Sequence, residues 1–208
     1  DVERYPNYFL VSFRCIETKN VIYFAITPDG YHVNGFFVEF GVWVNTLTFI
    51  LHRWLIIGFN SRSYDLPIVL VACQGLNYFK LNEITCEIIQ QDMQPYEVER
   101  KYKVKALAIN HIDIIQVAPI SASLKIYGGR LHCKRMQDLP YPFDTILTVE
   151  QAAHVRDYNI NDLDLTEMLY QHILPHIEMR EQLGREYLQD LRSKSDAQIA
   201  EAVITTEL

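Results

Sequence analysis

Cysteine is scarce in this chain: only four of the 208 residues are cysteines, and no two of them form a Cys-x-x-Cys pair. Zinc sites and disulfide frameworks in small domains depend on such spacing or on a higher density of cysteine. The composition therefore argues against both and indicates free thiols in a reducing compartment. We expect a cytoplasmic protein.

Long apolar runs are missing as well. The most apolar stretch, residues 46–59, is interrupted by His52 and Arg53, whereas a membrane-spanning helix needs about 20 consecutive apolar residues. No repeat or low-complexity segment occurs. With 49% hydrophobic residues in 208, we expect one large domain or a domain with a helical appendix, and no contact with a membrane.

Positive charge is in short supply, because 19 Lys and Arg residues face 26 Asp and Glu residues and the formal net charge is −7. Proteins that coat nucleic acid through a broad basic face neutralise phosphates with many Lys and Arg side chains, so this composition argues against that class. It does not exclude a metal-dependent nuclease, because bound cations reverse the sign of an acidic site. The densest basic cluster lies in residues 125–135 and includes Lys125 and Arg130.

The apolar patterns predict an α/β fold with a mixed central β-sheet flanked by helices. Strands are expected at residues 8–17 and 21–27, which form a hairpin, and at 35–44, 55–59 and 106–117. Helices are expected at residues 45–53, 67–74, 81–92, 124–127 and 148–175. The charged stretch 177–208 predicts a helical C-terminal extension or linker after a main domain at residues 1–176.

The chain opens on Asp1, Val2 and Glu3. If these residues form a strand, alternation places Asp1 and Glu3 on one face and Val2 in the core. Two neighbouring carboxylates can hold one hard cation, such as Mg²⁺ or Mn²⁺, between them. Such a pair also occurs without function at exposed strand ends, so its meaning depends on the rest of the chain.

Two later segments carry further candidate ligands. Asn60 follows a short apolar run, and Asp65 precedes Pro67, which can start a helix, so Asp65 is expected at the mouth of that helix. Tyr158 and Asp162 stand four apart in a predicted helix, which places hydroxyl and carboxylate on the same face. Each segment also fits a structural role, with Asp65 as a helix cap and Tyr158 as a packed residue of an amphipathic helix.

Taken in this order, the three segments resemble the motifs of the DEDD 3'→5' exonucleases, in the subclass whose last motif carries tyrosine. They are most similar to the proofreading exonuclease domains of B-family and phage-encoded DNA polymerases. The resemblance implies a ribonuclease H-like fold, two bound Mg²⁺ or Mn²⁺ ions and, for a phage protein, the cytoplasm of the bacterial host cell. It implies that Tyr158 orients the attacking water. The implied metal ligands are Asp1, Glu3, Asp65 and Asp162.

The resemblance extends to the substrate, which would be the 3' end of single-stranded DNA. Residues 123–131 resemble the Ser-Leu-Lys helix of phage-type exonuclease domains. An aromatic ring would stack on the terminal base, a contact that tolerates any sequence. In this family the acidic pair belongs to a longer central strand, so we expect residues upstream of Asp1 and a polymerase domain elsewhere in the natural protein. The implied substrate contacts are Asn60, Phe59, Tyr64, Lys125 and Arg130.

Two other interpretations stay open at this point. A free-standing exoribonuclease of the same superfamily would carry the same acids, because recognition of a 2'-hydroxyl lies in contacts that the sequence does not show. A non-catalytic docking module of a replication protein could keep the fold without the chemistry.

Overall fold

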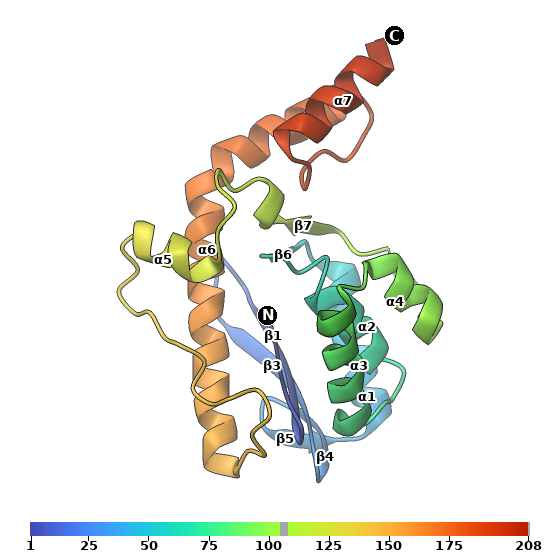
Figure 1. The fold of residues 1–208 in the computed structure, drawn as a ribbon, viewed down its shortest axis with the longest axis vertical. Helices are drawn as coiled ribbons and strands as arrows, with labels where there is room; N and C mark the ends of the chain where they lie inside the picture. Colours follow the sequence, from blue (N-terminus) through green and yellow to red (C-terminus); the bar gives the residue numbers. More distant parts are fainter. Residues whose placement is uncertain (105–107, 208) are drawn as a thin grey trace.

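The computed structural model of the chain describes residues 1–104 and 108–207. In these ranges the protein is a mixed α/β structure with seven α-helices, a five-stranded antiparallel sheet and a two-stranded parallel sheet. The predicted α/β class is confirmed. In Figure 1 the large sheet lies between the long helix α6 (Val149–Glu186) and three helices, α1 (Phe40–Arg53), α2 (Asp65–Ala72) and α3 (Tyr78–Gln91).

The antiparallel sheet follows the order of the chain. Its strands are β1 (Val2–Tyr5), β2 (Tyr8–Arg14), β3 (Val21–Thr27), β4 (Gly30–Val33) and β5 (Phe36–Val38). The predicted hairpin is confirmed as β2 and β3, with Phe9 opposite Ile26 and Arg14 opposite Val21. β1 pairs with β2 so that Glu3 lies opposite Leu10.

Alternation along these strands divides the apolar side chains between opposite faces of the sheet. One face supplies the main core, together with buried residues of α1, α2 and α3, and its members include Val2, Phe9, Val11, Phe24 and Ile26. The other face packs against Val155 of α6, and its members are Tyr5, Tyr8, Leu10 and Ala25. Glu3 and Tyr5 are two residues apart in β1, so both side chains lie on the face of the sheet that α6 covers.

The predicted strand over residues 35–44 is wrong beyond Val38. α1 begins at Phe40, before the helix that we expected from residue 45. A continuous apolar run fits a buried strand as well as a helix, and here tertiary packing decides. The helical spacing brings four side chains of α1 into the core: Trp43, Leu47, Ile50 and Leu51.

The next two helices agree with the sequence apart from their ends. α2 and α3 correspond to the helices predicted at residues 67–74 and 81–92, and both begin and end earlier than predicted. Gly75, with φ of +82°, ends the turn after α2. Pro95 begins α4 (Pro95–Tyr102), where a first-turn proline loses no helical hydrogen bond.

The parallel strands form a small sheet of their own. β6 (Ile56–Gly58) pairs with β7 (His111–Asp113), and the 3-10 turn η1 (Ile114–Gln116) follows. We predicted a single mixed sheet. In the described residues the two sheets are separate, because Ile57 and Ile112 pack into a second apolar cluster with α5 (Leu124–Arg130) and α6. The strand predicted at 106–117 begins within residues 105–107, which lie outside the described ranges.

Two helices begin at side-chain caps. The Ser123 side chain accepts a hydrogen bond from Ile126 at the start of α5. Thr148 and Gln151 exchange hydrogen bonds between side chain and backbone at the start of α6, which is a capping box. Both caps lie where a Ser or Thr precedes the first helical apolar residue.

Helix α6 is longer than the sequence suggested. We expected it to end near Pro175, but it continues to Glu186, so the predicted domain boundary at residue 176 falls inside it. Proline removes one backbone hydrogen bond, yet Ile173 and Ile177 on either side of it are buried in the second cluster and hold the helix. α7 (Asp196–Glu207) follows. Among the described helices, none combines the length and the apolar character needed to cross a membrane.

Candidate active site

Three carboxylates meet on the face of the sheet that α6 covers. Asp1 directly precedes β1, Glu3 lies in that strand, and Asp162 comes from the middle of α6. One oxygen of each lies within 4.8 Å of the others. Val2 between the two acids is buried in the main core, as strand alternation predicted.

These carboxylates lie where negative charge is costly. Burial, followed by the charges of Asp162 and Asp65, raises the pKa of Glu3 to about 8. Burial also raises the pKa of Asp162. A cation held among these oxygens would favour their ionised forms and would offset the cost of burial.

Asp65 lies beside this group without belonging to its three mutually close ligands. It is the first residue of α2, as the sequence predicted. Burial raises the pKa of Asp65, and the charge of the N-terminal amino group, followed by the backbone N–H of Val2, opposes that effect. Asp65 is therefore near enough to act on Glu3 and is available to hold a second ion.

Unpaired oxygen atoms suit this site to a cation. The Oδ1 atoms of Asp65 and Asp162 are buried and have no hydrogen-bond partner among the described residues. Buried carboxylate oxygens are rarely left unpaired in native proteins, and an ion is one way to satisfy them. The donors are all hard oxygens, which fits Mg²⁺ or Mn²⁺.

Tyr158 lies one helical turn before Asp162 on α6. Its side chain is buried, and burial followed by the charge of Asp162 raises its pKa, so the phenol keeps its proton at neutral pH. A pocket of about 230 Å³ opens beside it. The other residues that line this pocket are Arg135, Gln137, Asp138, Pro140, His154 and Asp157.

Lys125 on α5 faces the acidic group. Its Nζ atom lies 5.5 Å from the centroid of the Tyr158 ring and 3.2 Å from Oδ1 of Asp138. Its positive charge lowers the pKa values of Glu3 and Asp162, in opposition to burial. The structure thus brings a predicted substrate contact next to the predicted metal ligands.

The two predicted aromatic contacts are partly engaged in packing. Phe59 meets the ring of Tyr127 edge-on, with 6.2 Å between centroids, at the border of the second cluster. Tyr64 is half-buried against the main core, and burial raises its pKa.

Asn60 and Arg130, the remaining predicted contacts, are both exposed. Asn60 has a left-handed backbone with φ of +57°, and its N–H donates to the carboxylate of Asp113 at 2.9 Å. Arg130 ends α5 and forms no ion pair with the described residues. Neither side chain is brought into the group of carboxylates.

Two residues of the site escaped the sequence analysis. Asn159 is fully buried, and its Nδ2 donates to Oδ2 of Asp1 at 2.5 Å. Its position three residues before Asp162 places it on the same helix face, a signal that could have identified it. Asp113 is buried at the end of β7, and no motif in the sequence distinguished it.

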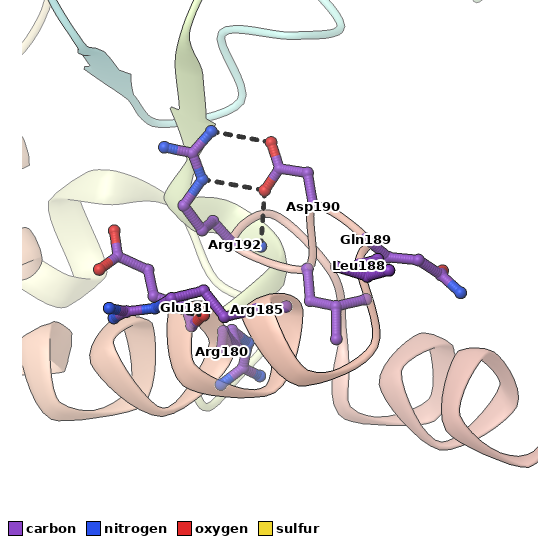
Figure 2. A pocket seen from close by; sticks show the side chains of 9 residues that line it. Arg180, Glu181, Arg185, Leu188, Gln189, Asp190 and Arg192 are labelled. Atoms are coloured by element: carbon purple, nitrogen blue, oxygen red, sulfur yellow. Dashed lines mark hydrogen bonds and ion pairs between the residues drawn. The ribbon is translucent and has the colours of Figure 1, made fainter. Parts of the chain in front are cut away.

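A larger pocket, of about 390 Å³, is formed by the end of α6 and the segment after it, and Figure 2 shows its lining. Arg192 pairs with Asp190 through two hydrogen bonds of 2.9 and 2.8 Å. Arg180 is buried and donates to the carbonyl oxygens of Lys194 and His176. The two arginines are thus used in holding this segment, and none of the predicted site residues lines the pocket.

The function of the acidic site has to be inferred from its own residues. In comparisons with protein families, with curated proteins and with solved structures, no match to this chain was found.

Proposed function

We propose that this chain is a metal-dependent 3'→5' exonuclease with a ribonuclease H-like fold, the proofreading domain of a B-family or phage-type DNA polymerase. The observation that carries the proposal is the meeting of Asp1, Glu3 and Asp162, with ligand oxygens within 4.8 Å of one another. Asp1 and Asp162 are 161 positions apart in the chain, and the acids follow one another in the order that the family motifs imply.

The arrangement of elements is compatible with this fold. An antiparallel hairpin follows the acidic strand β1, and helices cover both faces of the large sheet. β6 precedes α2 in the chain, β7 follows it, and these two strands pair in parallel. The acids come from β1, from the start of α2 and from α6.

In the proposed site, Asp1, Glu3 and Asp162 would hold one Mg²⁺ or Mn²⁺ ion, and Asp1 with Asp65 would hold a second. Two such ions would supply an activated water, a sink for phosphate charge and a stabilised leaving oxygen. Glu3 has to lose its proton to act as a ligand, so its raised pKa makes occupancy depend on pH.

The remaining residues orient the substrate and the water. Tyr158 keeps its proton, so its hydroxyl can hold the water in line with the phosphorus atom. Lys125 offers a positive charge to the phosphate from the side of α5. Water then adds across the terminal P–O3' bond and releases a nucleoside monophosphate from the 3' end of single-stranded DNA.

The experiment is release of mononucleotides from single-stranded DNA labelled at its 5' end, with Mg²⁺ or Mn²⁺ and with EDTA. Asp65→Ala combined with Asp162→Ala removes a ligand from each proposed ion and should abolish release. Asp164→Ala is the matched control, because this exposed acid of α6 pairs with Arg14 and not with the site. Unchanged release of mononucleotides by the double variant would contradict the proposal.

Two further readouts separate the other interpretations. Faster degradation of RNA than of a DNA oligonucleotide of the same sequence would favour an exoribonuclease. Absence of heat on titration with Mg²⁺ or Mn²⁺ would favour a non-catalytic docking module.

A further inference from the structure

The carboxylate of Asp113 holds the turn that leads from β6 toward the candidate site. Its Oδ1 accepts from the N–H of Asn60 at 2.9 Å and of Ile115 at 3.1 Å, and its Oδ2 accepts from the N–H of Arg62 at 2.9 Å. Asp113 is buried, and bonds from backbone N–H groups to a carboxylate are stronger than neutral ones. The two oxygens thus fix alternate amides of one turn.

The same turn is held at other points. The hydroxyl of the buried Ser61 lies 2.9 Å from Nε2 of His111, which is on the same strand as Asp113. The N–H of Leu66 donates to the carbonyl of Ser61 at 2.8 Å. A Cβ atom at Gly58 would come within 2.2 Å of the Ser61 hydroxyl oxygen, so this close packing requires glycine.

The turn needs such support because its first residue is strained. Asn60 has φ of +57°, a conformation that non-glycine residues adopt at a cost. Asn60 is also a predicted contact with the substrate, and Asp65 begins α2 only a few residues later. A shift of the turn would therefore move both residues.

On its other side Asp113 is tied to the C-terminal segment, which we define as residues 187–195. The N–H of Asp113 donates to Oγ of Ser193 at 2.9 Å, across 80 positions of sequence. Arg180 of α6 anchors the segment through the Lys194 carbonyl, and Arg192 is braced by Asp190 (Figure 2). The contact with Asp113 thus comes from a segment with its own fixed shape.

We propose that Asp113 is a positioning residue of the candidate site and that Ser193 couples the C-terminal segment to it. The contacts run from Ser193 to Asp113 and from Asp113 to the turn at residues 60–62. A partner domain that displaced the C-terminal segment would loosen the turn that carries Asn60 and leads to Asp65. The effect on catalysis rests on the proposed exonuclease function, whereas the effect on the turn does not.

Amide hydrogen exchange of the full chain, resolved by residue with NMR, tests the coupling. Ser193→Ala should speed exchange at Asn60 and Arg62 by roughly fivefold or more, because Asp113 loses a partner at a buried N–H. Ser195→Ala is the matched control, since the hydroxyl of this serine of the same segment accepts from the N–H of Gln198 at 3.3 Å. The control should change exchange near Gln198 and leave Asn60 and Arg62 unchanged.

Asp113→Asn tests positioning, because a carboxamide keeps only one acceptor oxygen. One of the two amides, Asn60 or Arg62, should stay protected, and the other should exchange about tenfold faster. Asp113→Ala should speed hydrogen exchange at both amides, Asn60 and Arg62. Unchanged protection in Ser193→Ala, or equal and unchanged protection of both amides in Asp113→Asn, would overturn the proposal.

Nuclease assays on the same variants complete the test. Ser193→Ala should raise KM for single-stranded DNA more than it lowers kcat, since Asn60, a proposed substrate contact, lies in the turn itself, whereas the proposed metal ligand Asp65 lies beyond the turn in α2. A wild-type chain without any nuclease activity would refute the proposed function, and the exchange measurements would still decide the role of Asp113.

Discussion

The Nδ2 atom of Asn159 lies 2.5 Å from Oδ2 of Asp1, so a buried amide of α6 holds the carboxylate at the very start of β1. One oxygen of the same carboxylate belongs to the group formed with Glu3 and Asp162. Residues that orient a metal ligand in this way are often as important for metal affinity as the ligand itself.

Asn159→Ala should therefore weaken Mn²⁺ binding by about 10- to 100-fold, measured by isothermal titration calorimetry. Asn7→Ala is the control, because Asn7 makes two hydrogen bonds of 2.9 Å to the backbone of Leu147 and lies outside the acidic group. Asn7→Ala should lower the melting temperature and leave the Kd for Mn²⁺ unchanged. Equal Mn²⁺ affinities in the two variants would contradict the role of Asn159.

Stabilisation of the chain by metal should increase with pH. Glu3 has a folded pKa of about 8 against 4.5 for the ordinary side chain, so its contribution to stability is full below pH 4.5 and declines as the pH rises toward 8. A bound ion would displace the proton of Glu3 and would offset this loss of stability at higher pH. The apparent affinity should rise by up to about tenfold per pH unit for each proton displaced.

The measurement is the shift of melting temperature by Mg²⁺ at several values between pH 6 and pH 8. The shift should grow with pH in the wild type, and this growth should be smaller in Glu3→Gln, which has no proton to lose. The same shift at pH 6 and pH 8 in the wild type would be inconsistent with Glu3 as a ligand.

Lys125→Met should weaken binding of single-stranded DNA without weakening metal binding. Lys125 faces the acidic group and lowers the pKa of Glu3 and Asp162, so its loss removes a charge that competes with a cation. For a lysine that contacts phosphate, the slope of log affinity against log salt should fall by about 1.

Fluorescence anisotropy with labelled DNA in the presence of Ca²⁺ measures this slope. Lys134→Met is the control, because Lys134 is exposed in the same basic stretch. An unchanged slope in Lys125→Met, or an equal change in both variants, would exclude a specific phosphate contact at Lys125.

His111 should make the stability of the chain fall in mild acid. Burial lowers the pKa of His111, and the positive charges of Arg62 and Arg192 lower it further. The negative charges of Asp113 and Asp190 raise this pKa and so oppose the effect of burial. The unfolded chain then takes up the proton first as the pH falls below about 6.5, so the contribution of neutral His111 is present above that pH and is lost below it.

Urea unfolding between pH 7.5 and pH 5.5 measures this dependence, which for one proton is at most about 1.4 kcal/mol per pH unit. His111→Gln should flatten the curve, and His172→Gln, at an exposed position of α6, should not. Parallel curves for His111→Gln and the wild type would show that His111 titrates equally in both states.

Local features of this fold were predictable because they depend on neighbours in sequence. The hairpin of β2 and β3 follows from alternation around a polar turn, and Asp65 at the start of α2 follows from Pro67 two residues later. The common face of Tyr158 and Asp162 follows from helical spacing alone.

Contacts between segments far apart in the chain could not be predicted from the sequence. Asn159 meets Asp1 across 158 positions, and Asp113 meets Ser193 across 80, and no periodicity connects such pairs. Tertiary packing likewise overruled local signals in residues 40–44, where an apolar run became helix, and at Pro175, where buried neighbours keep α6 continuous.

The most direct test of the exonuclease proposal is hydrolysis of a single-stranded DNA whose last linkage is a phosphorothioate. Sulfur binds Mg²⁺ poorly and Mn²⁺ better. If a metal ion contacts this phosphate, sulfur should therefore block cleavage with Mg²⁺, and replacement of Mg²⁺ by Mn²⁺ should restore it. We predict that one phosphorothioate isomer resists release of its 3' nucleotide with Mg²⁺ and is cut with Mn²⁺, while the ordinary linkage is cut with both. No release from the ordinary linkage with either ion would contradict the proposed function, and a block that Mn²⁺ does not relieve would contradict metal contact at the last phosphate.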